Sequence, residues 1–351
     1  MISNEAFVLS LGALLASVVF WAFRKLPDER WQFLASVPIV KDADGRWHGL
    51  NFTYYGLLTA NALVFGVALL AVLFGSVHIP TSVTVAVILA VLLPCLPAAR
   101  WVARLVEGKS CTFTIAGAFF VGILSAPAVL QALNYLLSFA AQPKVPILPA
   151  LAALMIAYTF GEGLGRLACI SFGCCYGVAL LEAPPLLKRA FDHWHFVFSG
   201  DMKKISYASG LAGKQVIPIQ AITCLIHLGV GLAATLLFLK AYFALAFVVS
   251  LTVTQGWRAF SEILRADHRG AGKLSAYQIM AILAIIYAGA LTLLLAPEHD
   301  VIPQLAAGIA AVWRVEVFLL LQALWALVFL MFGKSMVTGA QISFHLHHDR
   351  I

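Results

Sequence analysis

Charged side chains are scarce in this 351-residue chain, where Asp, Glu, Lys and Arg together make up 11% of the residues. Hydrophobic residues make up 62%, and the mean hydropathy is +0.94. A soluble domain of this length could not bury so much apolar surface, so the composition excludes a soluble globular protein. Ten-residue segments of alternating polarity are lacking too. We therefore predict an all-α fold, a polytopic bundle of about eight or nine membrane helices.

Several other signals are missing. The net charge of +7 is spread over short connections, which indicates anionic lipid head groups and no nucleic-acid partner. The six cysteines do not have the spacing of a disulfide framework. The first apolar stretch has no basic leader and no small-residue cleavage site, so we expect a retained span there. Paired inverted halves, which are typical of secondary transporters, are absent.

The apolar stretches are long enough to cross a membrane as helices. We predict spans at residues 6–23, 53–77, 80–105, 112–141, 146–170, 216–239, 241–264, 274–297 and 310–332. Two polar segments interrupt this pattern, at residues 24–52 and 178–215. The second mixes aromatic and charged residues, which predicts a small extramembrane cap or an interfacial helix.

Arginines occur where lipid is expected. Arg166 ends a long apolar run, and Glu162 lies four residues earlier, so the two share one face of a continuous helix and can pair. An arginine near the middle of a span costs about 2.5–3.5 kcal/mol to insert, so it persists where it faces a wet cavity, a partner or an anion. A second set has helical spacing and predicts one stripe along a later span: Arg258, Glu262, Arg265 and Arg269.

Two interpretations of these arginines remain open. They either snorkel at helix ends and pair with Glu162 and Glu262, or they converge on a cavity and bind a phosphate bidentately. Two arginine sites on separate spans, each beside glycines, favour the cavity. A phospholipid is the phosphate available at that depth, so we predict a lipid head-group site.

Three segments resemble the motifs of the bacterial prolipoprotein diacylglyceryl transferases. GRLACISFGCCYG (165–177) resembles the family signature, in which a Gly-Arg pair opens a thirteen-residue segment closed by glycine. IPIQAI (217–222) resembles its His-Pro-x-Gln-Leu-Tyr motif, and GWRAFSEILRAD (256–267) resembles its Gly-x-x-Arg-Phe…Glu-x-x-Arg motif. NFTYYGLL and KLSAYQIMAI look like further family segments. The strong part of the resemblance covers residues 150–290.

The resemblance implies a domain plan and a reaction. Residues 53–297 would form a transferase-like core that carries the cap, with an added span and polar arm in 1–52 and an added span and tail in 298–351. The family moves diacylglyceryl from phosphatidylglycerol to the lipobox cysteine thiol of a prolipoprotein and releases glycerol phosphate. We expect that transferase activity here, with phosphatidylglycerol and prolipoproteins as partners and no cofactor.

The resemblance also implies a location, the bacterial cytoplasmic membrane, with the catalytic mouth outside the cytoplasm. The charge distribution implies the opposite orientation, because Lys and Arg are denser around the cap than in the connections on the other side. We keep the orientation of the family as our expectation.

Roles for individual residues follow from the same resemblance. Arg166 and Arg258 would bind and polarise the phosphate as catalytic residues, because the leaving group develops negative charge in a site with little water. Glu262, the third catalytic candidate, would orient an arginine, and Gln220 would hydrogen-bond the head group. The remaining substrate-binding candidates are Gly165, Cys169, Gly173, Cys174, Tyr176, Gly177, Pro218 and Arg265.

The base that the reaction needs is not obvious in the sequence. A free thiol with a pKa of about 8.5 is mostly protonated at neutral pH, and the family's His or Tyr position is Ala116 here. Histidine titrates in the useful range, so we consider His268, just past the arginine stripe, and His193 and His195 in the cap. We expect His227, inside an apolar span, to be a hydrogen-bonded core residue.

Two further points stay open. Cys169, Cys174 and Cys175 are not spaced as the paired C-x-x-C of a zinc site, so we expect them to pack and predict no metal. The altered motif positions also permit a transferase of the same fold with another acceptor, such as a glycan, a small molecule or another lipid. A non-enzymatic lipid-binding protein is the alternative from a different class.

Overall fold

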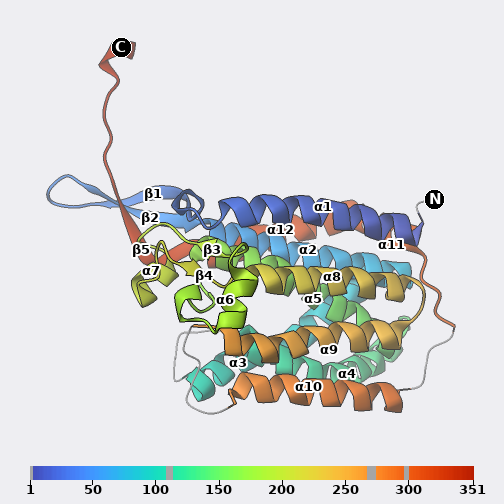
Figure 1. The fold of residues 1–351 in the computed structure, drawn as a ribbon. Coiled ribbons are helices and arrows are strands. Elements are labelled where there is room, and N and C mark those ends of the chain that lie inside the picture. Colours follow the sequence, from blue (N-terminus) through green and yellow to red (C-terminus); the bar gives the residue numbers. More distant parts are fainter. Residues whose placement is uncertain (1–2, 108–113, 267–273, 296–299) are drawn as a thin grey trace.

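The structure, a computed structural model, describes residues 3–107, 114–266, 274–295 and 300–351. Within those ranges nine helices are long and apolar enough to cross a membrane, and they lie side by side (Figure 1). Their bounds are α1 (Asn4–Lys25), α2 (Tyr54–Ser76), α3 (Thr81–Glu107), α4 (Ile115–Phe139), α5 (Ile147–Phe172), α8 (Ile219–Leu239), α9 (Phe243–Ser261), α10 (Ala276–Leu294) and α12 (Val315–Phe332). The prediction of an all-α, multi-pass bundle is confirmed.

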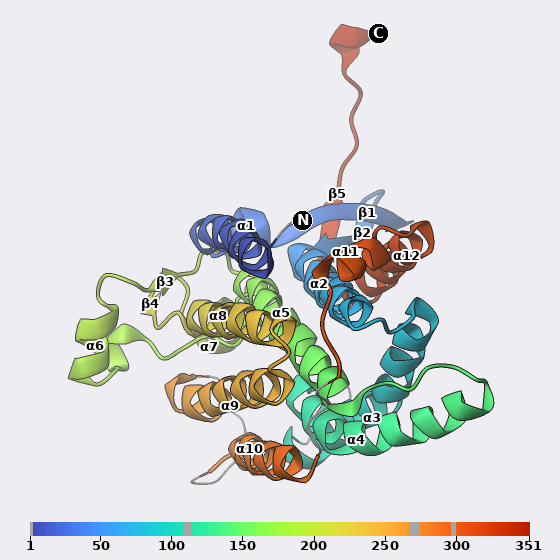
Figure 2. The same cartoon turned by 90° about the vertical axis from the view of Figure 1, so that its right-hand side faces the viewer.

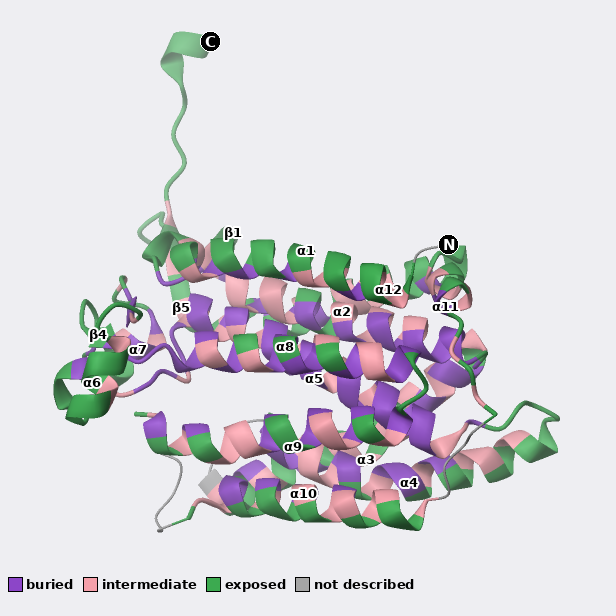
Figure 3. Cartoon of the chain, turned by 45° about the vertical axis from the view of Figure 1, so that its right-hand side comes forward, coloured by how far each residue is buried: buried purple, intermediate pink, exposed green. Residues whose placement is uncertain are grey.

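Apolar side chains remain on the outside of this bundle. Exposed residues follow the outer faces of α1, α10 and α12, whereas buried residues follow α5 and α8 (Figure 3). Leu9 on α1 is 73% exposed and Leu293 on α10 is 89% exposed. Such a surface is costly in water but not in lipid, whose acyl chains are as apolar as leucine.

Helix α5 occupies the centre of the bundle (Figure 2), with α2 on one side and α8 and α9 on the other. In its most apolar stretch 72% of the residues are buried, more than in any other candidate span of the described chain. Small residues permit the close packing: a Cβ on Gly66 of α2 would lie 2.9 Å from the carbonyl oxygen of Ala157 on α5. The charged residues of α5 are therefore carried into the protein interior and not to lipid.

The C-terminus of α5 is fixed by a glycine. Gly173 has a left-handed backbone with φ of 72°, and its N–H donates to the carbonyls of Cys169 and Ile170. Glycine adopts this conformation without a Cβ clash, so the chain can leave the helix here. At Gly165, by contrast, the helix simply continues, which confirms the shared face predicted for Glu162 and Arg166.

A small cap lies between α5 and α8, as predicted. It consists of η2 (Leu180–Glu182), α6 (Pro185–Phe191), β3 (Phe196–Val197), α7 (Lys204–Ser209) and β4 (Gln215–Val216). Strands β3 and β4 pair antiparallel. The cap stands at the end of the bundle where α1, α5 and α9 finish and α8 begins (Figure 1).

A three-stranded antiparallel sheet at the same end was not predicted. Strand β1 (Phe33–Lys41) pairs with β2 (Trp47–Thr53), and β2 pairs with β5 (Lys334–Ile342), so the order is β1-β2-β5. The polar arm after α1 is thus joined to the strand after the last span. The short elements η1 (Glu29–Trp31), η3 (Glu262–Leu264), α11 (Leu305–Val312) and η4 (His348–Arg350) complete the described fold.

Lys203 ties the cap to two helix ends. Its side chain is fully buried, and Nζ donates to the carbonyl oxygen of Leu26 at 3.1 Å and to that of Ser171 at 2.5 Å. These carbonyls belong to the C-terminal turns of α1 and α5, which lack intrahelical donors and carry the negative end of the helix dipole. Burial lowers the pKa of Lys203 from 10.5 to about 8.

Replacing Lys203 with Met should therefore alter how stability depends on pH. Because the folded-state pKa lies below the unfolded value, the unfolded chain binds more protons between about pH 8 and 10.5, and the contribution of Lys203 to stability grows across that window. The free-energy difference between wild type and Lys203→Met should widen there by up to about 3 kcal/mol. Thermal unfolding in detergent at a series of pH values measures it.

The exposed lysine Lys214 in the same cap provides the control. Lys214→Met should follow the wild-type curve throughout. A Lys203→Met curve parallel to wild type from pH 8 to 10.5 would show that the buried ammonium does not govern this end of the protein.

Candidate functional site

Two arginines from different helices meet at one carboxylate in the interior of the bundle. Glu162 and Arg166 form an ion pair on α5, and Nη1 of Arg258 on α9 lies 3.7 Å from the same Oε1 of Glu162. The carboxylate side chain is 5% exposed, and the two guanidinium side chains are 14% and 15% exposed. The structure thus brings Arg166 and Arg258 together from separate spans.

The shared carboxylate does not satisfy both cations. Nε of Arg166 and Nε of Arg258 are buried without a hydrogen-bond partner. Besides its contact with Glu162, Arg258 donates from Nη1 to the hydroxyl of Tyr158 at 3.4 Å, a long hydrogen bond. A guanidinium has five N–H donors in a fixed fork, and a buried donor without an acceptor is unfavourable. The arginine pair therefore retains donors for a further acceptor.

These residues line a narrow polar cleft between α5, α8 and α9. Its described lining consists of Glu162, Arg166, Thr223, His227, Trp257, Arg258, Ser261, Glu262 and Arg265. The lining contains three arginines and two glutamates, so with His227 neutral it carries a net positive charge. Glu162 lies ten residues before the end of α5, or about 15 Å along the helix. The cleft therefore reaches into the depth of the span.

The cleft is tight in this conformation. The empty volume of the cleft, including its mouth, is ≈ 300 Å³, but the lining side chains leave room inside for only about one water molecule. A phosphate head group enters only if the lining side chains move apart. The longer contact, between Arg258 and Glu162, is the one that such a movement breaks most easily.

His227 enters this cleft from α8. Its side chain is buried, and Nδ1 lies 2.9 Å from the carbonyl oxygen of Thr223. A carbonyl only accepts, so Nδ1 carries the proton and Nε2 of the neutral ring keeps its lone pair. Trp257 donates from Nε1 to the Thr223 hydroxyl at 2.9 Å, which fixes the same turn from α9.

His227 was expected in the core and not in the site. It is a hydrogen-bonded, buried histidine, but it also lines the cleft. The available signal was its position seven residues, about two turns, after Gln220 on the same helix. Glu162 was expected only as a partner of Arg166, and its contact with Arg258 was also missed.

The arginine stripe predicted from residue 258 onward is only partly a helix. Helix α9 ends at Ser261, the tight turn η3 covers Glu262–Leu264, and Arg265 is extended with φ of −90° and ψ of 144°. Arg265 forms a β-bridge with Gly177, in the loop after α5. The predicted helical stripe is wrong at Arg265, because pairing with that loop replaces the helical hydrogen bonds there. Arg265 and Glu262 nevertheless line the cleft.

Other residues named from the resemblance shape the loop after α5. Gln220 donates from Nε2 to the carbonyl oxygen of Cys174 at 2.8 Å, while its Oε1 is buried without a partner. The hydroxyl of Tyr176 hydrogen-bonds Ser209 in the cap. A Cβ on Gly177 would lie 2.5 Å from the carbonyl oxygen of Ile217, so only glycine fits. In the structure Gln220 lies against the loop, and its contact with a head group stays a prediction.

The remaining candidates lie elsewhere. Pro218 immediately precedes α8 and marks its N-terminal cap. His193 and His195 follow α6 in the cap and are not part of the described cleft lining. His268, like Arg269, lies outside the described residues. Ala116 is buried on α4.

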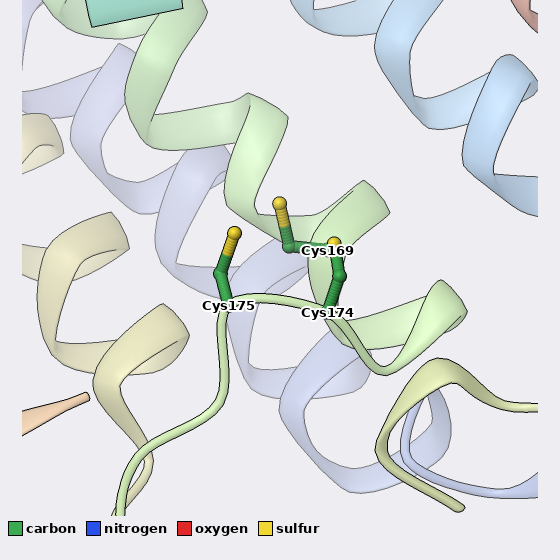
Figure 4. Close-up of side chains that lie close together, drawn as sticks. All are labelled: Cys169, Cys174 and Cys175. Carbon is green, nitrogen blue, oxygen red and sulfur yellow. The ribbon is translucent and has the colours of Figure 1, made fainter. Parts of the chain in front are cut away.

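Three thiols lie next to the arginine helix. Sγ atoms of Cys169, Cys174 and Cys175 all lie within 4.8 Å of one another (Figure 4). Cys169 is on the last turns of α5, and the other two are on the loop that follows Gly173. The expectation that these residues only pack did not anticipate this cluster, because their spacing along the chain does not show how the loop turns back.

No family model matches the chain, and no curated protein matches it. The short motifs therefore carry the sequence resemblance alone. The geometry around Glu162 is the structural feature that bears most directly on function.

Replacing Glu162 with Gln should destabilise the protein strongly. The substitution leaves two buried guanidinium groups without their shared counter-ion, which costs about 3–5 kcal/mol when one member of a buried pair is removed. Adding Arg166→Met should recover part of the loss, because one uncompensated charge is removed with it. Thermal unfolding of both variants in detergent measures these effects.

An exposed ion pair gives the matched control. Glu5 and Lys240 are 3.0 Å apart with side chains 54% and 45% exposed, so Glu5→Gln should leave the melting temperature nearly unchanged. Wild-type stability in Glu162→Gln, or simple additivity with Arg166→Met, would contradict the shared-carboxylate arrangement.

Proposed function

We propose that this protein is a membrane transferase with a glycerophospholipid donor. It moves a diacylglyceryl group from phosphatidylglycerol to an acceptor, most simply the lipobox cysteine thiol of a prolipoprotein. The observation that carries the proposal is the pair of guanidinium groups on α5 and α9, which share one carboxylate and keep two buried N–H donors free of protein partners. Carboxylate and phosphate both match the fork of a guanidinium group, and phosphate is the one that a membrane lipid supplies.

The arrangement suits the chemistry of the reaction. Sulfur of the acceptor thiolate attacks a glycerol carbon, an S–C bond forms, and the C–O bond to phosphate breaks with the electron pair leaving on glycerol phosphate. Arg166 and Arg258 neutralise the charge that develops on this leaving group, in surroundings where water is scarce. The phosphate would take over the longer contact of Arg258, while Glu162 continues to hold Arg166.

His227 is the best-placed base among the described residues. Its Nδ1 proton is committed to the Thr223 carbonyl, so Nε2 can accept the thiol proton. This role compensates for Ala116, which replaces the His or Tyr expected from the family resemblance. The cap and the sheet lie at one end of the bundle (Figure 1), and the cleft lining includes Glu262 and Arg265, which follow the end of α9 there. We propose that this end faces outside the cytoplasm of a bacterium.

Two alternatives use the same site. A different acceptor would agree with the altered motif positions, above all Ala116 and the loop role of Gln220. A lipid-binding protein without chemistry would need the arginine pair but not His227. Activity measurements on variants of these residues separate the possibilities.

The decisive experiment measures release of glycerol phosphate from radiolabelled phosphatidylglycerol by the purified protein with a lipobox peptide. Arg166→Ala and Arg258→Ala should each lower turnover by at least about 100-fold, as expected when one electrostatic contact to the leaving group is lost. Arg258→Lys should recover only a small part, because lysine lacks the planar fork. Arg104→Ala, at an exposed position on α3, is the control.

The outcomes distinguish the candidate functions. Release that requires the peptide supports the prolipoprotein reaction, whereas release without peptide indicates another acceptor or hydrolysis. Phosphatidylglycerol binding without release, lost in both arginine variants, indicates the lipid-binding protein. Full activity in both arginine variants would eliminate the proposed site.

Replacing His227 with Asn should separate chemistry from binding. The Asn amide nitrogen lies where Nδ1 was and can still donate to the Thr223 carbonyl, but it cannot take up a proton, so turnover should fall by about 100-fold while phosphatidylglycerol affinity changes little. Activity measured from pH 6 to 9 with a matching binding assay tests this. A proportional loss of binding, or an unchanged rate, would assign His227 a structural role.

A further inference from the structure

The three thiols beside the cleft come from two elements that converge. Cys169 projects from the end of α5, and Cys174 and Cys175 return toward it from the loop, with all three Sγ atoms within 4.8 Å of one another (Figure 4). No step of the proposed transfer uses them. Their convergence is therefore a separate feature of the molecule.

The loop is held in the conformation that gathers the sulfur atoms. Gly173 and Cys175 both have left-handed backbones, with φ of 72° and 58°. For a cysteine this conformation is unfavourable, because its Cβ crowds the backbone, so the surroundings must impose it. They do so through the hydrogen bond from Gln220 to the Cys174 carbonyl and through the bridge of Gly177 with Arg265. The thiol cluster is thus positioned before any ligand arrives.

The geometry fits a thiolate-bound metal ion. A metal–sulfur bond of about 2.3 Å places three ligating sulfur atoms roughly 4 Å apart in a trigonal site. The Sγ atoms lie within 4.8 Å of one another, so small side-chain rotations that move each sulfur atom by less than about 1 Å would bring them to the spacing of three metal ligands. Thiolates select soft ions such as Cu(I) and Zn(II) over hard ones.

The ligand set favours one of these ions. Among the described residues, no histidine or carboxylate joins the three sulfur atoms in the cluster. Structural zinc takes four protein ligands in a tetrahedron, whereas monovalent copper accepts three thiolates in a plane. An all-sulfur, three-ligand site therefore fits Cu(I) better than zinc.

The electrostatic surroundings support ligation. Arg166 lies about one helical turn before Cys169 on α5, and Arg265 pairs with Gly177 in the loop that carries Cys174 and Cys175. These two cations offset the negative charge of a metal–thiolate complex.

We propose that Cys169, Cys174 and Cys175 form a binding site for one thiophilic metal ion, with Cu(I) as the preferred occupant. The site lies one helical turn from Arg166 along α5 and is distinct from the residues that line the cleft. It does not depend on the proposed transferase activity.

The test uses the purified full chain in detergent, reduced and kept anaerobic. Titration with Cu(I) against a colorimetric Cu(I) chelator should show one tightly bound equivalent per chain. Cys175→Ser and, separately, Cys169→Ser should weaken binding by at least 100-fold. Zn(II) titrated against a zinc chelator should bind more weakly than Cu(I) in the wild type.

Cys224→Ser is the matched control, because Cys224 is a buried free thiol on α8 that does not belong to the cluster. It should bind Cu(I) like wild type. Melting temperatures identify any variant that fails to fold, and the two single cysteine variants provide independent readings. The proposal is overturned if the reduced wild type binds no Cu(I), if the cluster variants bind as tightly as wild type, or if thiol titration of the isolated protein reveals a disulfide within the cluster.

Discussion

The structure depends on one carboxylate that two cations share inside a membrane protein. Glu162 makes it possible to hold Arg166 and Arg258 close together in low-dielectric surroundings, where their mutual repulsion would otherwise separate α5 from α9. The carboxylate does not satisfy all the donors of the two arginines, since the buried Nε–H of each has no acceptor. Such an arrangement is stable enough to fold and still favours the arrival of another anion.

The elements around Glu162 hold the two arginines in place. Most residues of helix α5 are buried, and the helix packs against α2, α8 and α9. Its charged side chains therefore face the protein interior and not lipid. Gly173 ends the helix at a fixed point, and Lys203 binds the carbonyls at its end and at the end of α1. The loop that follows packs against the turn after α9 through Gly177 and Arg265. The same contacts that define the cleft also bring the three thiols together.

The sequence predicts the features that depend on residues near one another along the chain. The spans follow from apolar length, and the pair Glu162–Arg166 follows from its spacing on a helix. The meeting of Arg166 and Arg258 from separate spans was also predicted, but most other features that depend on distant segments were not. The contact of Glu162 with Arg258, the entry of His227 into the cleft and the pairing of β2 with β5 each join residues that no local pattern relates. The thiol cluster was not predicted, because it depends on the left-handed backbone of Cys175, which the spacing of cysteines along the chain does not indicate.

The sheet at the end of the bundle requires an even number of membrane crossings between two of its strands. Strands β2 and β5 are hydrogen-bonded neighbours, so the segments before α2 and after α12 must emerge on the same side of the bilayer. Eight candidate spans of the described chain, from α2 to α12 with α11 too short to count, lie between them, and an even number of crossings returns the chain to its starting side. During synthesis β5 emerges only after the last of these crossings. The pairing of β2 with β5 can therefore form only after all the spans between them have been inserted.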